Sequence, residues 1–182
     1  MKRKSLPFIV IIFVSAILIA CPNPKKYSEI PEIEFRQVVL KDTVDGLGNN
    51  VKLFKLIFGI TDGDGNIGFR DDETPYIYNG DTLDNNFFTT LHEVINGDTI
   101  EADSSVQRNF RVPYVEPEGQ NKTLIAEIII DIEFSYNQSG ELPYDSIFYE
   151  FYIVDRELNE SNRESTLAVK LDTLGFFPQV ID

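Results

Sequence analysis

Apolar and polar residues alternate along most of this chain with the two-residue period of β-strands. The alternation is clearest in residues 123–136, where Ile128, Ile130 and Ile132 alternate with charged residues. Residues 146–155 repeat the pattern with aromatic and aliphatic side chains. Because a period of two places alternate side chains on opposite faces of a strand, we predict β-strands and no helix for the main part of the chain.

Six further segments are rich in β-branched and aromatic residues and end at turn-forming residues. They are residues 33–41, 51–61, 86–95, 99–101, 106–115 and 166–171. Asn96-Gly97 is typical of a tight hairpin turn, and Pro113 predicts an edge strand or a bulge. About seven or eight short strands predict a single antiparallel β-sandwich over residues 33–182. We expect its core to contain Ile128, Ile130, Ile132, Tyr149, Phe151 and Ile153.

Residues 1–21 have a different pattern. A basic head, Lys2-Arg3-Lys4, precedes an almost unbroken apolar run over residues 8–20, which leads into Cys21. A bilayer-spanning helix needs about 20 apolar residues, so this run is too short to be one. The segment resembles a bacterial lipoprotein signal, in which residues 1–20 are removed and Cys21 carries fatty acyl chains such as palmitate. The alternative is an ordinary thiol at a conventional cleavage site.

Cys21 is the only cysteine in the chain, so no intrachain disulfide is possible. Two acyl chains anchor a protein stably, so the resemblance implies a domain that is held at a membrane. Residues 22–31 contain three prolines and two lysines. This composition predicts an extended, mobile tether. We assign residues 21–32 to the lipidated cysteine and this tether.

Composition excludes several classes of function. The net charge of −14 disfavours nucleic acid as a partner, because binding phosphates needs a basic face. Tryptophan is absent, which makes carbohydrate binding less expected, although tyrosine can replace it. His92 is the only histidine, and the chain has neither a Gly-x-Ser-x-Gly motif nor a phosphate-binding glycine loop. We therefore expect no catalytic residues and a protein that is not an enzyme.

The segment of residues 61–73 is rich in aspartate and glycine. Asp62, Asp64 and Asn66 alternate with glycines, so a tight turn can aim three side-chain oxygens inward. Calcium prefers about six to eight oxygen ligands in a flexible geometry, which suits such a loop. The spacing resembles an EF-hand loop, but Ile67 stands where an EF-hand has glycine and strands flank the segment. The candidate ligands of a structural calcium ion are Asp62, Asp64, Asn66, Asp71, Asp72 and Glu73.

The alternative for this segment is a solvated turn, in which the Asp and Asn side chains only accept hydrogen bonds from the local backbone.

Three motifs resemble a group of lipoproteins of unknown function from Bacteroidetes-type bacteria. They are residues 59–68, which include Asp62-Gly63-Asp64-Gly65-Asn66-Ile67-Gly68, then residues 118–122, and then residues 152–162. The third motif is also similar to the penultimate strand and turn of immunoglobulin-like and fibronectin-like modules, where an Asp and an Asn hold the last hairpin. The resemblance implies an immunoglobulin-like sandwich in the cell envelope and no established activity.

In these bacteria an acidic cluster after the lipidated cysteine resembles a surface-export signal, and none follows Cys21. We therefore expect the outer membrane, with the domain facing the periplasm; exposure on the cell surface is the alternative.

Five triplets of Asp, then Ser or Thr, then an aliphatic residue resemble the O-glycosylation sequon of the same bacteria. Their hydroxyl residues are Thr43, Thr82, Thr99, Ser146 and Thr173. On the order of one such triplet is expected by chance in a chain of this composition. The alternative is that Asp before a β-branched residue marks the junction between a turn and a strand.

These features predict a non-catalytic envelope lipoprotein that binds another envelope protein or a glycan. The first alternative is an accessory subunit of an outer-membrane protein assembly, and the second is a glycan-binding module. A large exposed apolar patch would favour a protein partner, whereas a concave aromatic groove near the acidic loop would favour glycan.

Overall fold

The computed structural model describes residues 26–70, 76–78, 80–117 and 121–179. Strands dominate these residues, and the helix found among them is a single 3₁₀ turn, η1 (Ser104–Val106). The prediction of an all-β chain is therefore confirmed.

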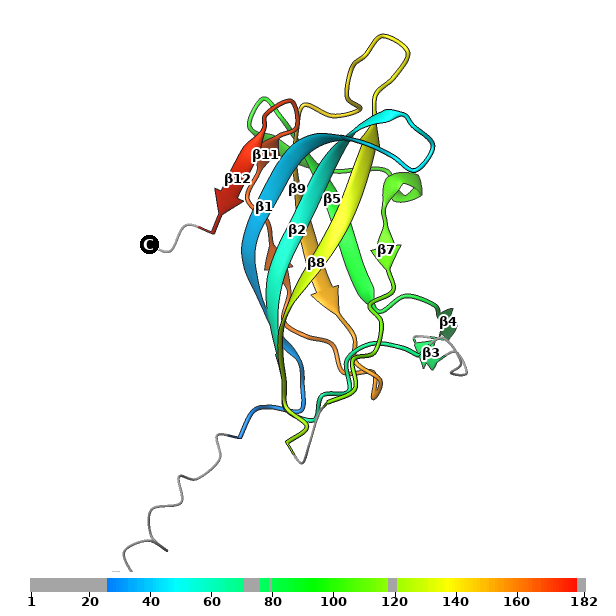
Figure 1. The fold of residues 1–182 in the computed structure, drawn as a ribbon, viewed down its shortest axis with the longest axis vertical. Coiled ribbons are helices and arrows are strands. Elements are labelled where there is room, and N and C mark those ends of the chain that lie inside the picture. The colour runs from blue at the N-terminus through cyan, green and yellow to red at the C-terminus, as the bar shows by residue number, and fades with distance from the viewer. Residues whose placement is uncertain (1–25, 71–75, 79, 118–120, 180–182) are drawn as a thin grey trace, which may run out of the picture.

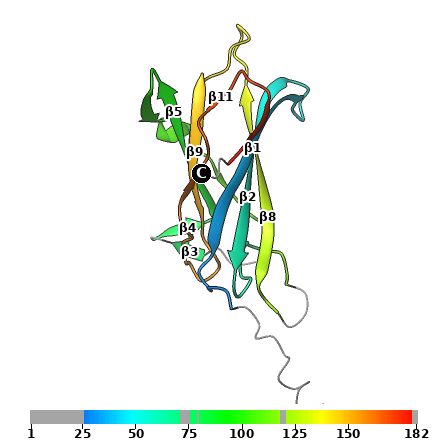
Figure 2. The ribbon, with the colours of Figure 1, turned by 90° about the vertical axis from the view of Figure 1, so that its left-hand side faces the viewer.

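Two antiparallel sheets face each other in the structure (Figures 1 and 2). The first sheet has the strand order β12-β1-β2-β8. Its members are β1 (Glu32–Val44), β2 (Asn50–Asp62), β8 (Leu124–Ser135) and β12 (Gly175–Pro178). The second sheet has the order β10-β9-β5-β6, with β11 beside β9 and β7 beside β5. Its members are β5 (Phe87–Ile95), β6 (Asp98–Glu101), β7 (Asn109–Phe110), β9 (Ser146–Ile153), β10 (Glu164–Ser165) and β11 (Val169–Lys170).

A short hairpin of β3 (Tyr76–Tyr78) and β4 (Asp81–Leu83) forms a separate pair. Leu83 belongs to a small apolar cluster with Phe69 and Val154, against which Phe88 of β5 and Tyr152 of β9 pack. This cluster attaches the hairpin to the second sheet.

The core lies between the two sheets and is built from aromatic rings. Phe58 of β2 stacks on Phe87 of β5 with ring centroids 5.0 Å apart, and its centroid is 5.3 Å from that of Phe151 on β9. Large aromatic side chains contribute much of the apolar area that a small domain buries. All the predicted core residues belong to this cluster, with Ile128 only partly buried.

The predicted strand over residues 106–115 is wrong. Only Asn109–Phe110 forms a strand there, pairing with β5. Asp103 accepts a hydrogen bond from the Ser105 backbone N–H at 2.9 Å, which supports the 3₁₀ turn instead. The Gln107 side chain accepts from the Leu91 N–H at 2.6 Å and so takes the place of a strand partner. The strands β3, β4, β10 and β12 were also not predicted.

The C-terminal part of the predicted tether is fixed on the sandwich. The Ser28 carbonyl accepts a hydrogen bond from the Gly63 N–H at 2.7 Å. Pro31 is buried, and β1 begins at Glu32. The mobility expected for residues 22–31 therefore does not hold for residues 28–31.

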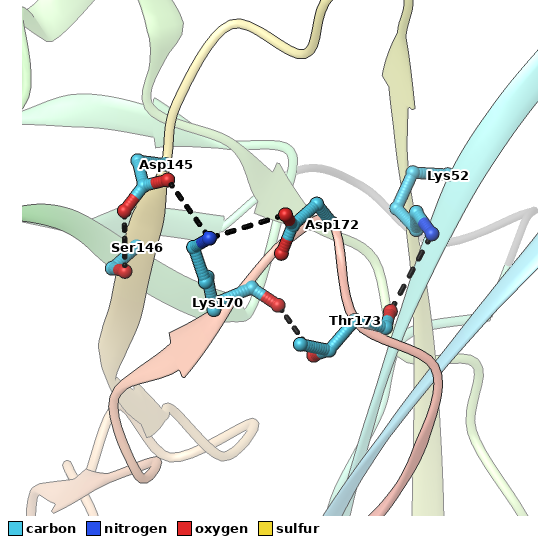
Figure 3. Close-up of polar contacts among 6 residues, drawn as sticks. All are labelled: Lys52, Asp145, Ser146, Lys170, Asp172 and Thr173. Atoms are coloured by element: carbon cyan, nitrogen blue, oxygen red, sulfur yellow. Dashed lines mark hydrogen bonds and ion pairs between the residues drawn. The ribbon is translucent and has the colours of Figure 1, made fainter.

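A buried lysine lies toward the opposite end of the sandwich. Lys52 of β2 is 2% exposed, and its Nζ is 2.7 Å from Asp42 Oδ1. It also donates to the Thr173 carbonyl at 3.4 Å (Figure 3). The Lys52 hydrogen bond is the largest cause that lowers the pKa of Asp42 below its ordinary value. The ion pair satisfies an ammonium group that burial would otherwise destabilise.

We expect Ile130→Asp to unfold the domain, because Ile130 is 7% exposed and the new carboxylate would have no partner in the core. Burying an unpaired charge costs several kcal/mol, and a typical domain is stable by only about 5–15 kcal/mol. The neighbouring Ile129 is 50% exposed, so Ile129→Asp serves as the matched control. Circular dichroism during thermal unfolding measures both, and equal melting temperatures would contradict the assignment of the two faces of β8.

Candidate functional site

The acidic loop begins at the last residue of β2, at the end of the sandwich where the chain enters β1 (Figure 1). Two of its glycines lie against other backbone segments. A Cβ at Gly65 would stand 2.0 Å from the Lys122 carbonyl, and one at Gly63 would stand 2.5 Å from the Ser28 carbonyl. Gly65 also has a positive φ of 65°, which glycine adopts readily. The tight turn therefore requires glycine at both positions.

The structure brings the predicted residues Asp62, Asp64 and Asn66 together. Asp62 Oδ2 accepts a hydrogen bond from the Asn66 backbone N–H at 2.9 Å. Asp64 Oδ2 accepts one from Asn66 Nδ2, also at 2.9 Å. The second carboxylate oxygen of Asp62 and of Asp64, Oδ1, and the amide oxygen of Asn66 are buried and have no hydrogen-bond partner. One loop thus contains three buried side-chain oxygens without a hydrogen-bond partner.

Asp62 is the most deeply enclosed of the three, with a side chain that is 0% exposed. Burial and, next, the charge of Asp64 raise the pKa of Asp62 from 3.8 to about 7, while the Asn66 N–H acts in the opposite direction. Asp155 adds a smaller unfavourable charge. A carboxylate in this position needs a proton or a cation to be stable.

The loop differs from an EF-hand for a reason that the structure makes clear. Ile67, which stands at the glycine position of an EF-hand, is 1% exposed and belongs to the main core cluster. The loop therefore turns back into the sandwich.

The remaining predicted ligands, Asp71, Asp72 and Glu73, lie outside the described residues. Within the described part of the chain, no three His, Cys, Asp or Glu side chains are grouped so that they could hold a metal ion. The site there consists of two carboxylates and one amide, with the other ligands of a cation left to water or to further residues.

The sequence analysis did not place the turn after β9 at this site. Asp155 is fully buried and accepts hydrogen bonds from the Glu157 and Asn159 backbone N–H groups, each at 2.8 Å. The Arg156 N–H donates to the Asn66 carbonyl at 3.4 Å, which joins the turn to the acidic loop. The motif of residues 152–162 contained the signal, since an Asp and an Asn were expected to hold this hairpin.

Asn162 of the same motif bonds the start of β1. Asn162 Oδ1 accepts from the Ile33 N–H at 2.8 Å, and Asn162 Nδ2 donates to the Ile33 carbonyl at 2.9 Å. These bonds hold the start of β1 against the segment that leads into β10.

The lipidation residue Cys21 lies outside the described residues. Among the residues that are described, no helix is long and apolar enough to cross a membrane.

The five candidate glycosylation residues are spread over both sheets and the small hairpin. Thr82 and Thr99 are exposed, whereas Thr43, Ser146 and Thr173 are half-buried. Ser146 donates its hydroxyl hydrogen to Asp145 Oδ2 at 3.1 Å, and Thr173 donates to the Lys170 carbonyl at 2.6 Å (Figure 3). Most of the triplets fall where a turn meets a strand, as the alternative explanation of the pattern requires.

No protein-family model matches the chain, no curated protein is significantly similar to it, and no solved structure matches it. The resemblance to envelope lipoproteins therefore stays a prediction. The same holds for an immunoglobulin-like order of connections between the strands. The geometry of the acidic loop and the exposed surfaces of the sandwich are the features that bear on function.

We expect Gly65→Ala to destabilise the protein more than Gly48→Ala. Both glycines have positive φ, so each alanine carries a backbone cost of about 1–2 kcal/mol. At Gly48 nothing lies within 4 Å of the new Cβ, whereas at Gly65 the Lys122 carbonyl blocks it. Urea unfolding measures the difference. Equal losses would mean that the acidic loop is not packed against residue 122.

Proposed function

We propose that this protein is a lipid-anchored β-sandwich of the cell envelope that acts by binding a partner and is stabilised by a calcium ion in the acidic loop. The observation that carries the proposal is the set of three buried, unpartnered oxygens, Oδ1 of Asp62, Asp64 and Asn66. Buried polar atoms in proteins almost always have a partner, so three without one in a single loop favour a bound cation.

Calcium fits this loop better than magnesium does. It takes about six to eight oxygen ligands at about 2.3–2.6 Å in a flexible geometry, whereas magnesium needs a near-ideal octahedron. Two carboxylates supply charge and Asn66 supplies a neutral oxygen, while water molecules would supply further ligands. Burial and, next, the charge of Asp64 raise the pKa of Asp62, and in this proposal the cation balances the charge of both carboxylates.

The role of the cation in this proposal is structural. The loop holds the end of β2, the Ser28 carbonyl and, through Asn66, the turn that begins at Asp155. Calcium would therefore fix the end of the sandwich from which the lipidated N-terminus emerges. His92 lies on β5, where it stacks on Phe148 at 4.7 Å, and it belongs to no part of this loop.

Binding of a protein partner is supported by the exposed apolar side chains of the first sheet. Phe176 is 74% exposed, and Ile125 of β8 is 63% exposed. The cleft nearest the acidic loop has Tyr27 as the single aromatic residue of its described lining, which does not favour a glycan. An envelope protein partner, including the larger assembly of the accessory-subunit alternative, is therefore favoured over glycan.

Thermal unfolding in millimolar calcium and in chelator tests whether the folded protein binds the cation. A ligand that binds only the folded state stabilises it by about 2.7 kcal/mol at a hundredfold excess over its Kd. For a domain of this size this raises the Tm by about 5–10 °C. Asp64→Asn should lose most of this shift, because it removes one charged ligand.

In chelator, Asp64→Asn should have a melting temperature equal to or above that of the parent. The substitution removes the charge of Asp64, which opposes ionisation of Asp62. Glu101→Gln on the exposed β6 is the control and should keep the full calcium shift. Identical melting curves for the parent in calcium and in chelator would leave the loop as a solvated turn.

Cell fractionation tests the anchor. We expect Cys21→Ser to move the protein from the membrane fraction to the soluble fraction and to abolish incorporation of radiolabelled palmitate. The membrane association depends on two or more acyl chains in this proposal, so removal of their attachment site should release the protein. Unchanged membrane association of the variant would rule out lipidation at this residue.

A further inference from the structure

Strand β8 forms one edge of the four-stranded sheet (Figures 1 and 2). It pairs with β2 over its full length, from Leu124 to Ser135. In the described part of the chain no strand pairs with its other side. A long, open edge strand is a template for an added strand, because it presents a row of unpaired backbone groups.

The orientation of these backbone groups follows from one side-chain contact. Arg108 Nη1 donates to the Glu133 carbonyl at 3.0 Å, so this carbonyl points away from β2. Backbone groups of an antiparallel strand alternate between its two neighbours. The N–H and C=O groups of Ile125, Glu127, Ile129 and Asp131 therefore also point to the open side. Arg108 covers the edge at Glu133, which leaves the stretch from 125 to 131 accessible.

The side chains of the same residues lie on the outer face of the sheet and set the chemistry of a partner. Ile125 and Ile129 are exposed apolar residues, and Glu127 between them is an exposed acid. Asp131 is already paired with Lys55 of β2 at 2.5 Å. A strand added beside β8 would therefore meet two isoleucines with an unpaired carboxylate between them.

A second copy of this chain does not match that surface. Two β8 edges paired antiparallel would place carboxylates opposite carboxylates in some registers and opposite isoleucines in the others. Like charges directly opposite each other destabilise a strand pair, and a carboxylate opposite an isoleucine satisfies neither. The charge pattern therefore selects against self-association through this edge.

We propose that the open edge of β8, from Ile125 to Asp131, binds an extended segment of a partner protein. In that segment a Lys or Arg faces Glu127 and apolar side chains face Ile125 and Ile129. The segment adds as a strand through backbone hydrogen bonds, which supply affinity, while the alternating side chains supply specificity. The inference specifies the partner-binding part of the proposed function and does not depend on the calcium site.

Synthetic peptides test whether the open edge of β8 binds an added strand. The mature protein is used in detergent and in saturating calcium. The probe has the repeat Lys-Thr-Val-Thr-Lys-Thr-Val, and its control has Glu in place of Lys. We expect the lysine peptide to bind at least about tenfold more tightly by fluorescence anisotropy. Glu127→Lys should reverse the preference. Equal binding of both peptides, or binding of neither, would overturn the proposal.

Backbone pairing is tested by Ile129→Pro, which removes an N–H that points to the open side and leaves the β2 ladder intact. This variant should bind the lysine peptide at least about tenfold more weakly. If it fails to fold, amide hydrogen exchange of the parent gives the same information. Peptide binding should slow exchange at Ile125, Glu127 and Ile129.

Binding that leaves these three amides unprotected would contradict strand addition. A concentration-dependent dimer abolished by Ile129→Pro would instead assign the edge to a second copy and overturn the partner proposed here. If the parent melts at the same temperature in calcium and in chelator but still binds the lysine peptide, the result counts against the calcium site alone.

Discussion

Strand β2 is enclosed on every side, and the acidic loop is a consequence of this constraint. β1 and β8 bond its two edges, and nearly all of its side chains are buried. Its last residue, Asp62, stays paired in register with Leu124, so its carboxylate remains in the interior. The chain then turns back through Gly63 and Gly65, which brings Asp64 and Asn66 to the same place. The sheet thus holds a buried carboxyl group at the end of β2, and the proposed cation would balance its charge.

The alternating strands were predictable because their side chains have opposite environments on their two faces. Residues 128–134 and 147–153 alternate as expected, and the Asn96-Gly97 turn has positive φ at both positions, as a tight hairpin needs. Residues 106–115 were not predictable in this way. Side chains of Asp103 and Gln107 replace backbone pairing there, and such contacts depend on distant residues such as Leu91.

The candidate site was predictable in part. The spacing of Asp62, Asp64 and Asn66 and the glycines between them indicated a turn with converging oxygens. The contacts that enclose the turn come from elsewhere in the sequence and involve backbone atoms, namely the Ser28 and Lys122 carbonyls and the Arg156 N–H. Backbone atoms carry no sequence signal, so neither the docking of the tether nor the depth of Asp62 was visible in the pattern. Together they place Ser28, the acidic loop and the segment that leads into β8 at one end of the sandwich.

A crystal structure of the mature domain grown with calcium tests the central claim most directly. The account predicts a calcium peak within about 2.3–2.6 Å of Oδ1 of Asp62, Asp64 and Asn66, confirmed by its anomalous signal. Water molecules alone in that position at saturating calcium, with Asp62 bonded to Asp64 through a proton, would contradict it.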